Sequence, residues 1–353
     1  MAPGTVTTRT GPRQPARPPR ALAGVRRRLS ISGVVPFALL VAILVLIVVV
    51  EPQAATYDGM SLLLIGALPV AFATMAQLFV MAAGDIDLGI GAFVGLVNAL
   101  VVVVLSEHGL TGALALAAAV LGYVAMGALI TVRRIPSLTL TFGMASVWLG
   151  LAIVVLPTPG GTAPLFLITW LNTTTPVVPL PVIVLVVLAV VCQLLLFGTR
   201  LGVRLRAVGA SPVAAARAGV PVLRMRLVLY ALAGLMGVLA GLALSGQTGS
   251  GDANGAVTIV LTTVAAVIVG GGSFDGGDVN ALGAVAGAVA LGLLSSLLAF
   301  LNVSSDYTLG LQGVILIAAV GVRVGSRWAA RLQHRHAPPA RRPAGAEQEV
   351  ERV

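Results

Sequence analysis

Two aspartates stand close together in residues 84–91 (GDIDLGIG), between two long apolar segments. An acidic side chain inside a membrane-spanning segment costs about 2.5–3.5 kcal/mol on insertion scales, so it usually serves a function. Asp85 or Asp87 could therefore line a path for a polar solute. The alternative is that Asp87 caps the following helix by accepting hydrogen bonds from its first amides. The two roles are compatible.

Motifs for covalent, nucleotide or metal chemistry are missing from the sequence. The chain has no lysine, so it cannot form the Gly-x-x-x-x-Gly-Lys-[Ser/Thr] loop that holds nucleotide phosphates. One cysteine, Cys192, excludes a disulfide framework and a cysteine-cluster metal site. We therefore expect no catalytic residue, no metal and no cofactor on this chain.

The composition is that of a membrane protein. Of the 353 residues, 58% are hydrophobic before the 42 glycines are counted, and only 10% are charged. Soluble domains carry about 25% charged residues. Apolar segments that are long enough to cross a bilayer as helices, or nearly so, follow one another from residue 34. The sequence predicts an all-α polytopic protein with about ten spans, at 34–50, 60–83, 90–105, 110–132, 138–156, 180–198, 227–244, 256–269, 281–301 and 308–324.

The arginines predict the orientation of these spans. All 22 basic residues are arginine, and basic residues concentrate in the cytoplasmic segments of membrane proteins. If the N-terminus is cytoplasmic and ten spans alternate, every arginine falls in a cytoplasmic segment or, for Arg323, at the cytoplasmic end of the last span. The net charge of +10 then reflects topology and argues against nucleic-acid binding. We expect cytoplasmic tails at 1–33, which is predicted to be disordered, and at 325–353, around a transmembrane domain at 34–324.

The third and eighth predicted spans are short, and glycine-rich sequence flanks both. They lie five spans apart and so run in opposite directions, as expected for two inverted halves. Short spans at matching positions of such halves are the best sequence indicator of a transporter's solute path. Further glycine-rich breaks lie at 245–252, predicted outside, and at 270–277, predicted inside. Close helix packing instead explains glycines such as Gly283, Gly287 and Gly292.

The longest predicted cytoplasmic loop, residues 199–226, contains a short helix at 211–219. Ser211 suits its N-cap, Pro212 its first turn and Gly219 its end. A short alanine-rich helix does not fold alone, so we expect it to be held against another surface. The alternative is that it lies on anionic lipid, beside the arginines of the loop.

Three stretches together resemble the permease subunits of ATP-binding-cassette importers for ribose, xylose, galactose and autoinducer-2. Residues 84–91 are similar to the family's GGIDLSVG, and residues 200–220 to its cytoplasmic coupling loop. Residues 269–277, with the glycines that follow, resemble its GGTSLxGG stretch. The resemblance covers about residues 35–324. Asp85 replaces a usual glycine and Gly89 a usual serine, so the lining of the path is altered.

The resemblance implies a transport subunit and not an enzyme. Such permeases pair as a dimer, expected here to be a homodimer, in the cytoplasmic membrane of a prokaryote. They take a monosaccharide or a related small polar solute from an extracytoplasmic solute-binding protein. Two copies of a separate ATPase, which holds ATP and magnesium, drive them through the coupling loop. The residues expected to couple to the ATPase are Arg206, Ala207, Gly209, Ser211, Ala215, Arg217 and Gly219.

The solute path on this interpretation needs only weak polar contacts, because the binding protein supplies selectivity. We predict that it is lined by Gln77, Asp85, Asp87, Asn98, Thr139, Thr141 and Gln247. The two threonines could instead bond to carbonyls of their own helix. Two alternatives stay open: a permease of the same architecture for branched amino acids or nucleosides, and an ion-coupled secondary transporter that uses the two aspartates. The predicted coupling loop argues against the second, which needs no docking surface.

Overall fold

The computed structural model describes residues 21–303, 307, 310, 313, 314 and 317. In this part of the chain an isolated bridge between Gly160 and Gly251 is the only β-pairing, and the regular elements are helices. They are α1 (Ala21–Val50), α2 (Tyr57–Ala82), α3 (Ile90–Leu100), α4 (Gly109–Arg133), α5 (Ser137–Val155), α6 (Leu165–Leu171), α7 (Leu180–Gln193), α8 (Arg200–Ala210), α9 (Pro212–Arg217), α10 (Val222–Thr248), α11 (Ile259–Val269) and α12 (Ala281–Phe300). A 3₁₀ turn, Pro52–Ala55, precedes α2, and π-helical turns extend α3 and α7.

Apolar helices coincide with nine of the ten predicted spans in the described chain. Six are long and apolar enough to cross a membrane, namely α2, α4, α5, α7 with its extension, α10 and α12. Three shorter apolar stretches are Val34–Val50, Ile90–Leu105 and Ile259–Val269. Most of the predicted span 308–324, and all of the tail 325–353, lie outside the described residues. The predicted class, a polytopic helical membrane protein, fits these helices.

Three local elements differ from the sequence prediction. Helix α1 begins at Ala21, whereas the sequence predicted a disordered tail up to residue 33; residues 1–20 lie outside the described part. Extending a formed helix costs little free energy compared with nucleating one. The helix formed by the apolar part of α1 can therefore extend into the polar residues that precede it. Helix α6, of seven residues, is too short to show a periodicity. Helix α8 was expected as loop, and the Thr199 side chain caps it by accepting from the Gly202 N–H at 2.9 Å.

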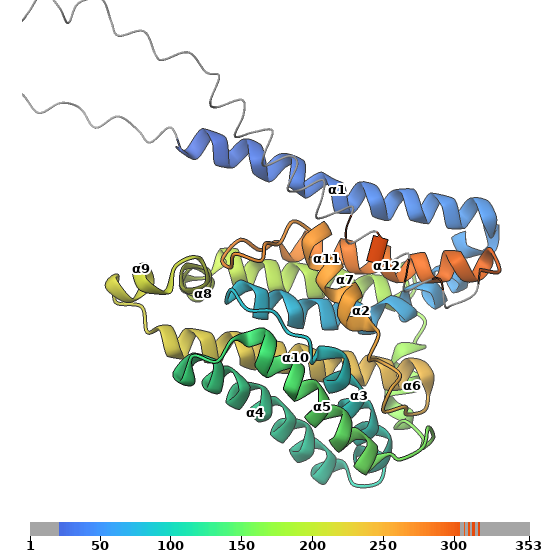
Figure 1. The fold of residues 1–353 in the computed structure, drawn as a ribbon. Coiled ribbons are helices and arrows are strands. Elements are labelled where there is room, and N and C mark those ends of the chain that lie inside the picture. The colour runs from blue at the N-terminus through green and yellow to red at the C-terminus, as the bar shows by residue number, and fades with distance from the viewer. Residues whose placement is uncertain (1–20, 304–306, 308–309, 311–312, 315–316, 318–353) are drawn as a thin grey trace, which may run out of the picture.

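Helix α2 forms the centre of the molecule. It packs against α10, α12, α11 and α7. In its most apolar stretch of 18 residues, 83% of the residues are buried, whereas the corresponding share in α5 is 17%. Figure 1 shows α1 lying along α12 on one side of α2 and α10, and α4 with α5 on the other. The outward faces of α4, α5 and α7 expose many leucine and valine side chains. Such extended apolar surface is rare on soluble monomers and is typical of contact with lipid.

Close packing accounts for two of the glycines in α12, as predicted. A β-carbon on Gly283 would lie 2.1 Å from the Gly270 carbonyl oxygen, and one on Gly287 would lie 2.7 Å from the Ala266 carbonyl oxygen. Both contacts join α12 to α11 and the turn that follows it. At Gly292 the nearest atom would be 3.6 Å away, which is ordinary contact. Small residues thus bring these two helices together.

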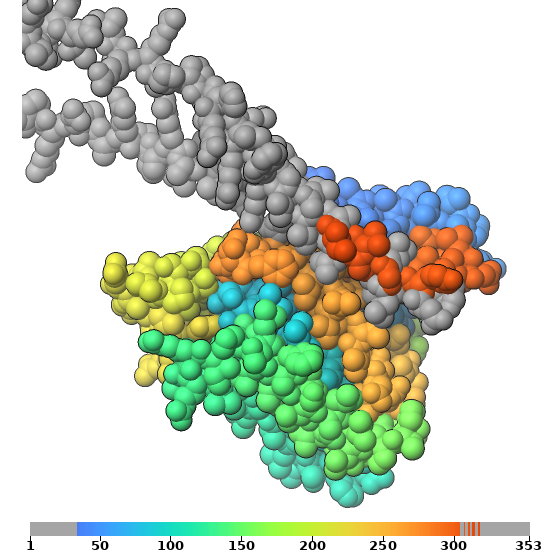
Figure 2. All heavy atoms as spheres, in the orientation of Figure 1, coloured from blue at the N-terminus to red at the C-terminus, as the bar shows by residue number. Residues whose placement is uncertain are grey.

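Helices α8 and α9 project together from one end of the bundle (Figures 1 and 2). The predicted short helix is confirmed as α9: the Ser211 hydroxyl accepts from the Ala214 N–H at 3.2 Å, and Pro212 is its first residue. Gly219 follows with a φ of 78°, the left-handed conformation that ends many helices. We name α8, α9 and the turn 218–221 the projecting segment.

Candidate functional site

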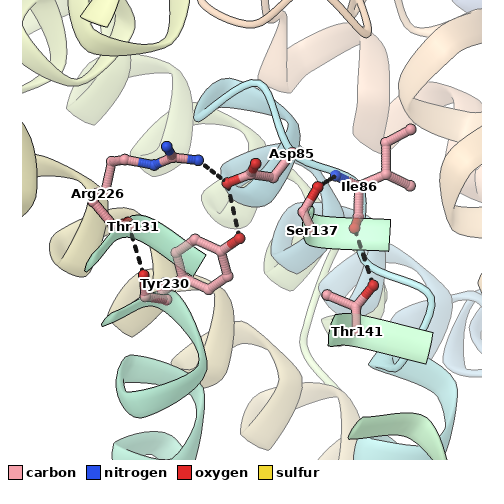
Figure 3. A network of polar contacts seen from close by, with 8 residues as sticks. Asp85, Ile86, Thr131, Ser137, Thr141, Arg226 and Tyr230 are labelled. Carbon is pink, nitrogen blue, oxygen red and sulfur yellow. Dashed lines mark hydrogen bonds and ion pairs between the residues drawn. The ribbon is translucent and has the colours of Figure 1, made fainter. Parts of the chain in front are cut away.

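The chain between α2 and α3, residues 83–89, is non-helical and carries both aspartates; we call it the α2–α3 break. The Asp85 side chain points toward α10, as Figure 3 shows. Its Oδ2 accepts hydrogen bonds from the Arg226 guanidinium and, at 2.9 Å, from the Tyr230 hydroxyl. The ion pair is mostly removed from water, because the side chains of Arg226 and Asp85 are only 16% and 9% exposed.

Asp87 is completely buried and faces α4 and α2 instead. Its carboxylate accepts a hydrogen bond from the Tyr123 hydroxyl and another, at 2.7 Å, from the Gly89 N–H. Gln77 on α2 holds the main chain of Asp87, donating to its carbonyl at 3.0 Å and accepting from its N–H at 3.2 Å. The N-cap of α3 is Gly89 and not Asp87, so the carboxylate closes the turn that leads into α3, and the predicted cap of the first helix amides stays a prediction.

The backbone of the break is anchored to the first turns of α5. Ser137 Oγ accepts from the Ile86 N–H at 3.4 Å. Thr141 accepts from the Leu88 N–H and donates to the Ile86 carbonyl, both at 3.2 Å (Figure 3). The predicted bond of Thr141 to its own helix, to the Leu138 carbonyl, is longer at 3.5 Å. Four predicted path residues, Gln77, Asp85, Asp87 and Thr141, therefore meet around the α2–α3 break.

The other three predicted path residues lie elsewhere. Thr139 is exposed on α5, and Gln247 is exposed near the end of α10. Asn98 is buried in α3 near that same end of α10, where its Nδ2 donates to Ser245 Oγ and its Oδ1 accepts from the Asp252 N–H, both at 2.8 Å. It thereby holds the loop that follows α10. A role of any of the seven residues in a solute path stays a prediction.

Replacing Asn98 by alanine should loosen this loop, because the partly buried Asp252 N–H would lose its acceptor. A buried donor left without a partner costs about 1–3 kcal/mol. We expect the N98A protein to melt at a lower temperature and to be cleaved faster by protease within 249–254. The matched control is N172A, since the exposed Asn172 amide bonds only its own helix, at Ile168. Equal melting and cleavage of N98A and N172A would contradict this prediction.

Three backbone segments meet at the end of the bundle that carries α8 and α9: residues 82–84, 206–210 and 276–277. The Gly277 N–H donates to the Ala82 carbonyl at 3.1 Å. A β-carbon on Gly209 would lie 1.8 Å from the Ala82 carbonyl oxygen, and one on Gly276 would lie 2.6 Å from the Gly209 carbonyl oxygen. Only glycine allows main chains to approach so closely. The glycine-rich breaks at 84–91 and 270–277 thus share this end, and the break at 245–252 lies at the other end of α10.

The predicted coupling residues divide between the inside and the outside of the projecting segment. Gly209 and Ala215 are buried, whereas Arg217 and Gly219 are exposed. The Arg206 guanidinium carbon lies 4.0 Å from the centre of the Phe197 ring, and its Nε donates to the Leu196 carbonyl at 3.1 Å. Partial burial lowers the pKa of Arg206. The residues Val203, Arg204, Val213 and Arg217 are exposed, so the outer face mixes apolar and basic side chains.

Three residues of the break's surroundings were missing from the predicted path: Tyr123, Arg226 and Tyr230. Arg226 and Tyr230 lie four residues apart in one helix and so share a face. This spacing could have indicated that both side chains bind the same group. Tyr123 is the one aromatic residue of α4, but nothing in its local sequence indicates a partner 36 positions away. In the described chain no group of three or more histidine, cysteine or acidic residues could hold a metal ion.

Comparison with known proteins identifies clear relatives. The family model described as branched-chain amino acid transport system / permease component matches residues 59–320. The L-arabinose ABC transporter permease of Azospirillum brasilense is 32% identical over 318 residues, which are 86% of this chain and 90% of the relative. The ribose import permease of Bacillus subtilis is 31% identical over 259 residues, 69% of this chain and 77% of the relative. That of Escherichia coli K12 is 28% identical over 294 residues, 80% and 91% of the two chains. No solved structure matches significantly.

Proposed function

The chain belongs to the family of branched-chain amino acid transport system / permease components, and from this premise we propose that it is the permease subunit of an importer that moves a monosaccharide across the cytoplasmic membrane. The names of the relatives, which are permeases for ribose and arabinose, support the substrate class. A separate ATPase that carries ATP and magnesium drives the import. A solute-binding protein delivers the sugar to this chain, which itself catalyses no reaction.

The observation that carries the proposal is the projecting segment. It stands out from the bundle and presents an exposed apolar and basic face, on which Val213 is 63% exposed. On its inner side, Gly209 touches the main chain of Ala82 at the α2–α3 break. A partner that binds the outer face and moves the projecting segment therefore also acts, through the contact of Gly209 with Ala82, on the core of the membrane domain. A ligand can shift such an equilibrium only through contacts that differ between two states, and this face offers those contacts to the ATPase.

The proposed topology has about ten spans in two inverted halves, with both termini in the cytoplasm. Its support is the matching length of α3 and α11, which have 11 residues each, and the positions of the glycine-rich breaks at the two ends of α10. The projecting segment, which is rich in arginine, then lies on the cytoplasmic side. Two copies of the chain form the pore as a homodimer, and the predicted path residues other than Asp85 and Asp87 contact the solute weakly.

ATPase stimulation tests the proposal directly. The chain is reconstituted in liposomes with the ATPase and the binding protein encoded beside it, and ribose, arabinose, xylose and leucine are added in turn. We expect one of the three sugars to raise ATP hydrolysis and to accumulate in the liposomes. Stimulation by leucine alone would favour an amino acid permease. Uptake that needs an ion gradient and no ATPase would overturn the proposal.

A reversed charge on the outer face should uncouple the two proteins. Arg217→Glu is expected to lower sugar-stimulated ATP hydrolysis about tenfold, which corresponds to about 1.4 kcal/mol of lost interaction. The control is Arg133→Glu, an exposed arginine at the end of α4, outside the projecting segment. Co-purification of the ATPase with each variant is measured in parallel. An R217E protein that retains the ATPase and full stimulation would show that α9 is not the contact.

A further inference from the structure

The ion pair between Asp85 and Arg226 joins two parts of the chain that have different neighbours. Asp85 belongs to the α2–α3 break, which α5 also anchors through Ser137 and Thr141. Arg226 lies near the beginning of α10, and its guanidinium reaches across to Asp85 while the Tyr230 hydroxyl binds the same oxygen (Figure 3). The pair therefore connects the break with the helix that leaves the projecting segment.

The turn between α9 and α10 is short and internally bonded. The Gly219 and Val220 N–H groups donate at 3.0 Å to the carbonyls of Ala216 and Ala215, respectively. The Met225 N–H donates to the Pro221 carbonyl at 3.1 Å, directly after the turn. Because the short turn between α9 and α10 is held by these hydrogen bonds, a displacement of α9 moves the first turns of α10, which contain Arg226. The ion pair then passes it on to Asp85.

The break thus has two separate connections to the projecting segment. One is uncharged, the close backbone approach of Gly209 of α8 to Ala82, which is the last residue of α2 directly before the break. The other is the charged pair between α10 and Asp85. Within the described residues, the buried Nε of Arg226 has no hydrogen-bond partner.

We propose that Asp85 and Arg226 are positioning residues that transmit movement of the projecting segment to the α2–α3 break, and so couple the ATPase to the opening of the solute path. This inference rests on the proposed function. It assigns to Asp85 a role in coupling, in place of contact with the solute, and it separates Asp85 from Asp87, which bonds Tyr123 and the Gly89 N–H.

The test uses the reconstituted importer with D85N, R226Q and the double variant D85N/R226Q. Each single variant leaves one buried charge without its partner, which destabilises a protein strongly. The double variant removes both charges, so its melting temperature should recover toward that of the wild type. In all three variants, the amount of sugar imported per ATP hydrolysed should stay about fivefold or more below that of the wild type. A factor of about five is the lower end of typical coupling between two sites. Arg226→Lys keeps the positive charge, so this variant should retain part of the sugar import per ATP hydrolysed.

The outcomes separate this inference from the proposed function. A wild-type complex that imports no solute with ATP refutes the proposed function. If the wild type imports sugar and the double variant recovers both stability and import per ATP, the pair is structural and the inference fails.

A second measurement needs no substrate. Hydrogen–deuterium exchange of the purified chain should rise in residues 83–89 of D85N/R226Q and stay unchanged in 249–254. Equal exchange of the wild type and the double variant in residues 83–89 would refute the proposed effect of the Asp85–Arg226 pair on the α2–α3 break, even if transport could not be measured.

Discussion

A single methyl group added at Gly209 should disable this permease. In G209A the new β-carbon would lie 1.8 Å from the Ala82 carbonyl oxygen and 2.7 Å from the Gly277 backbone nitrogen. Neither neighbour is a flexible side chain, so α8 must move away from the α2–α3 break. Overpacking of this kind costs about 1–3 kcal/mol and at times more. We expect a lower melting temperature and at least about a tenfold loss of sugar-stimulated ATP hydrolysis, which is about 1.4 kcal/mol of lost coupling.

The matched control for G209A is G150A. Gly150 lies within helix α5, and a β-carbon there would meet nothing within 4 Å. Alanine inside a helix is favoured over glycine by roughly 0.5–1 kcal/mol, so G150A should be at least as stable as the wild type and transport normally. Melting is followed by size-exclusion chromatography of heated samples in detergent. A G209A protein with the melting temperature and stimulation of G150A would show that the close backbone contact is not required.

Truncating Asp87 is expected to have the largest effect on folding of any acidic residue in the described chain. D87A would remove the acceptor of two buried donors, the Tyr123 hydroxyl and the Gly89 N–H. Each buried donor left unpaired costs about 1–3 kcal/mol, and the turn that leads into α3 loses its side-chain bond. We expect little folded D87A in the membrane, measured as the monodisperse fraction after detergent extraction, and no sugar uptake.

The isosteric variant D87N separates the structural bonds of Asp87 from a contact with the solute. Its side-chain oxygen can still accept from Tyr123 or Gly89, so D87N should stay folded and retain most of its uptake. Glu107→Ala, which removes an exposed acid from the turn before α4, is the control for loss of charge alone and should behave like the wild type. A D87N protein that is fully folded but inactive would show that the carboxylate contacts the solute. A D87A protein as stable as E107A would show that the bonds to Tyr123 and Gly89 do not stabilise the fold.

Membrane class, helix positions and the short helix α9 could be predicted because their signals are local. An apolar segment at 60–83 suffices to indicate a spanning helix, and Ser211 with Pro212 suffices to indicate where α9 begins. Glycine-rich sequence similarly marked where helices break. Each signal depends on hydropathy or on hydrogen bonds between residues a few positions apart. Elements with weak local signals, such as α6 and α8, were missed for the same reason.

The partners of the buried polar groups were decided by tertiary structure alone. Asp85 and Arg226 are 141 positions apart, and Asn98 and Ser245 are 147 apart, so neither pair leaves a trace in local periodicity. Sequence reasoning placed Asp85, Asp87 and Asn98 in one group because all three are polar within apolar surroundings. In the fold their side chains point to α10, to α4 and to the loop after α10, respectively. A polar side chain removed from water must find a hydrogen-bond partner inside the protein, and which partner it finds depends on the helices that pack beside it.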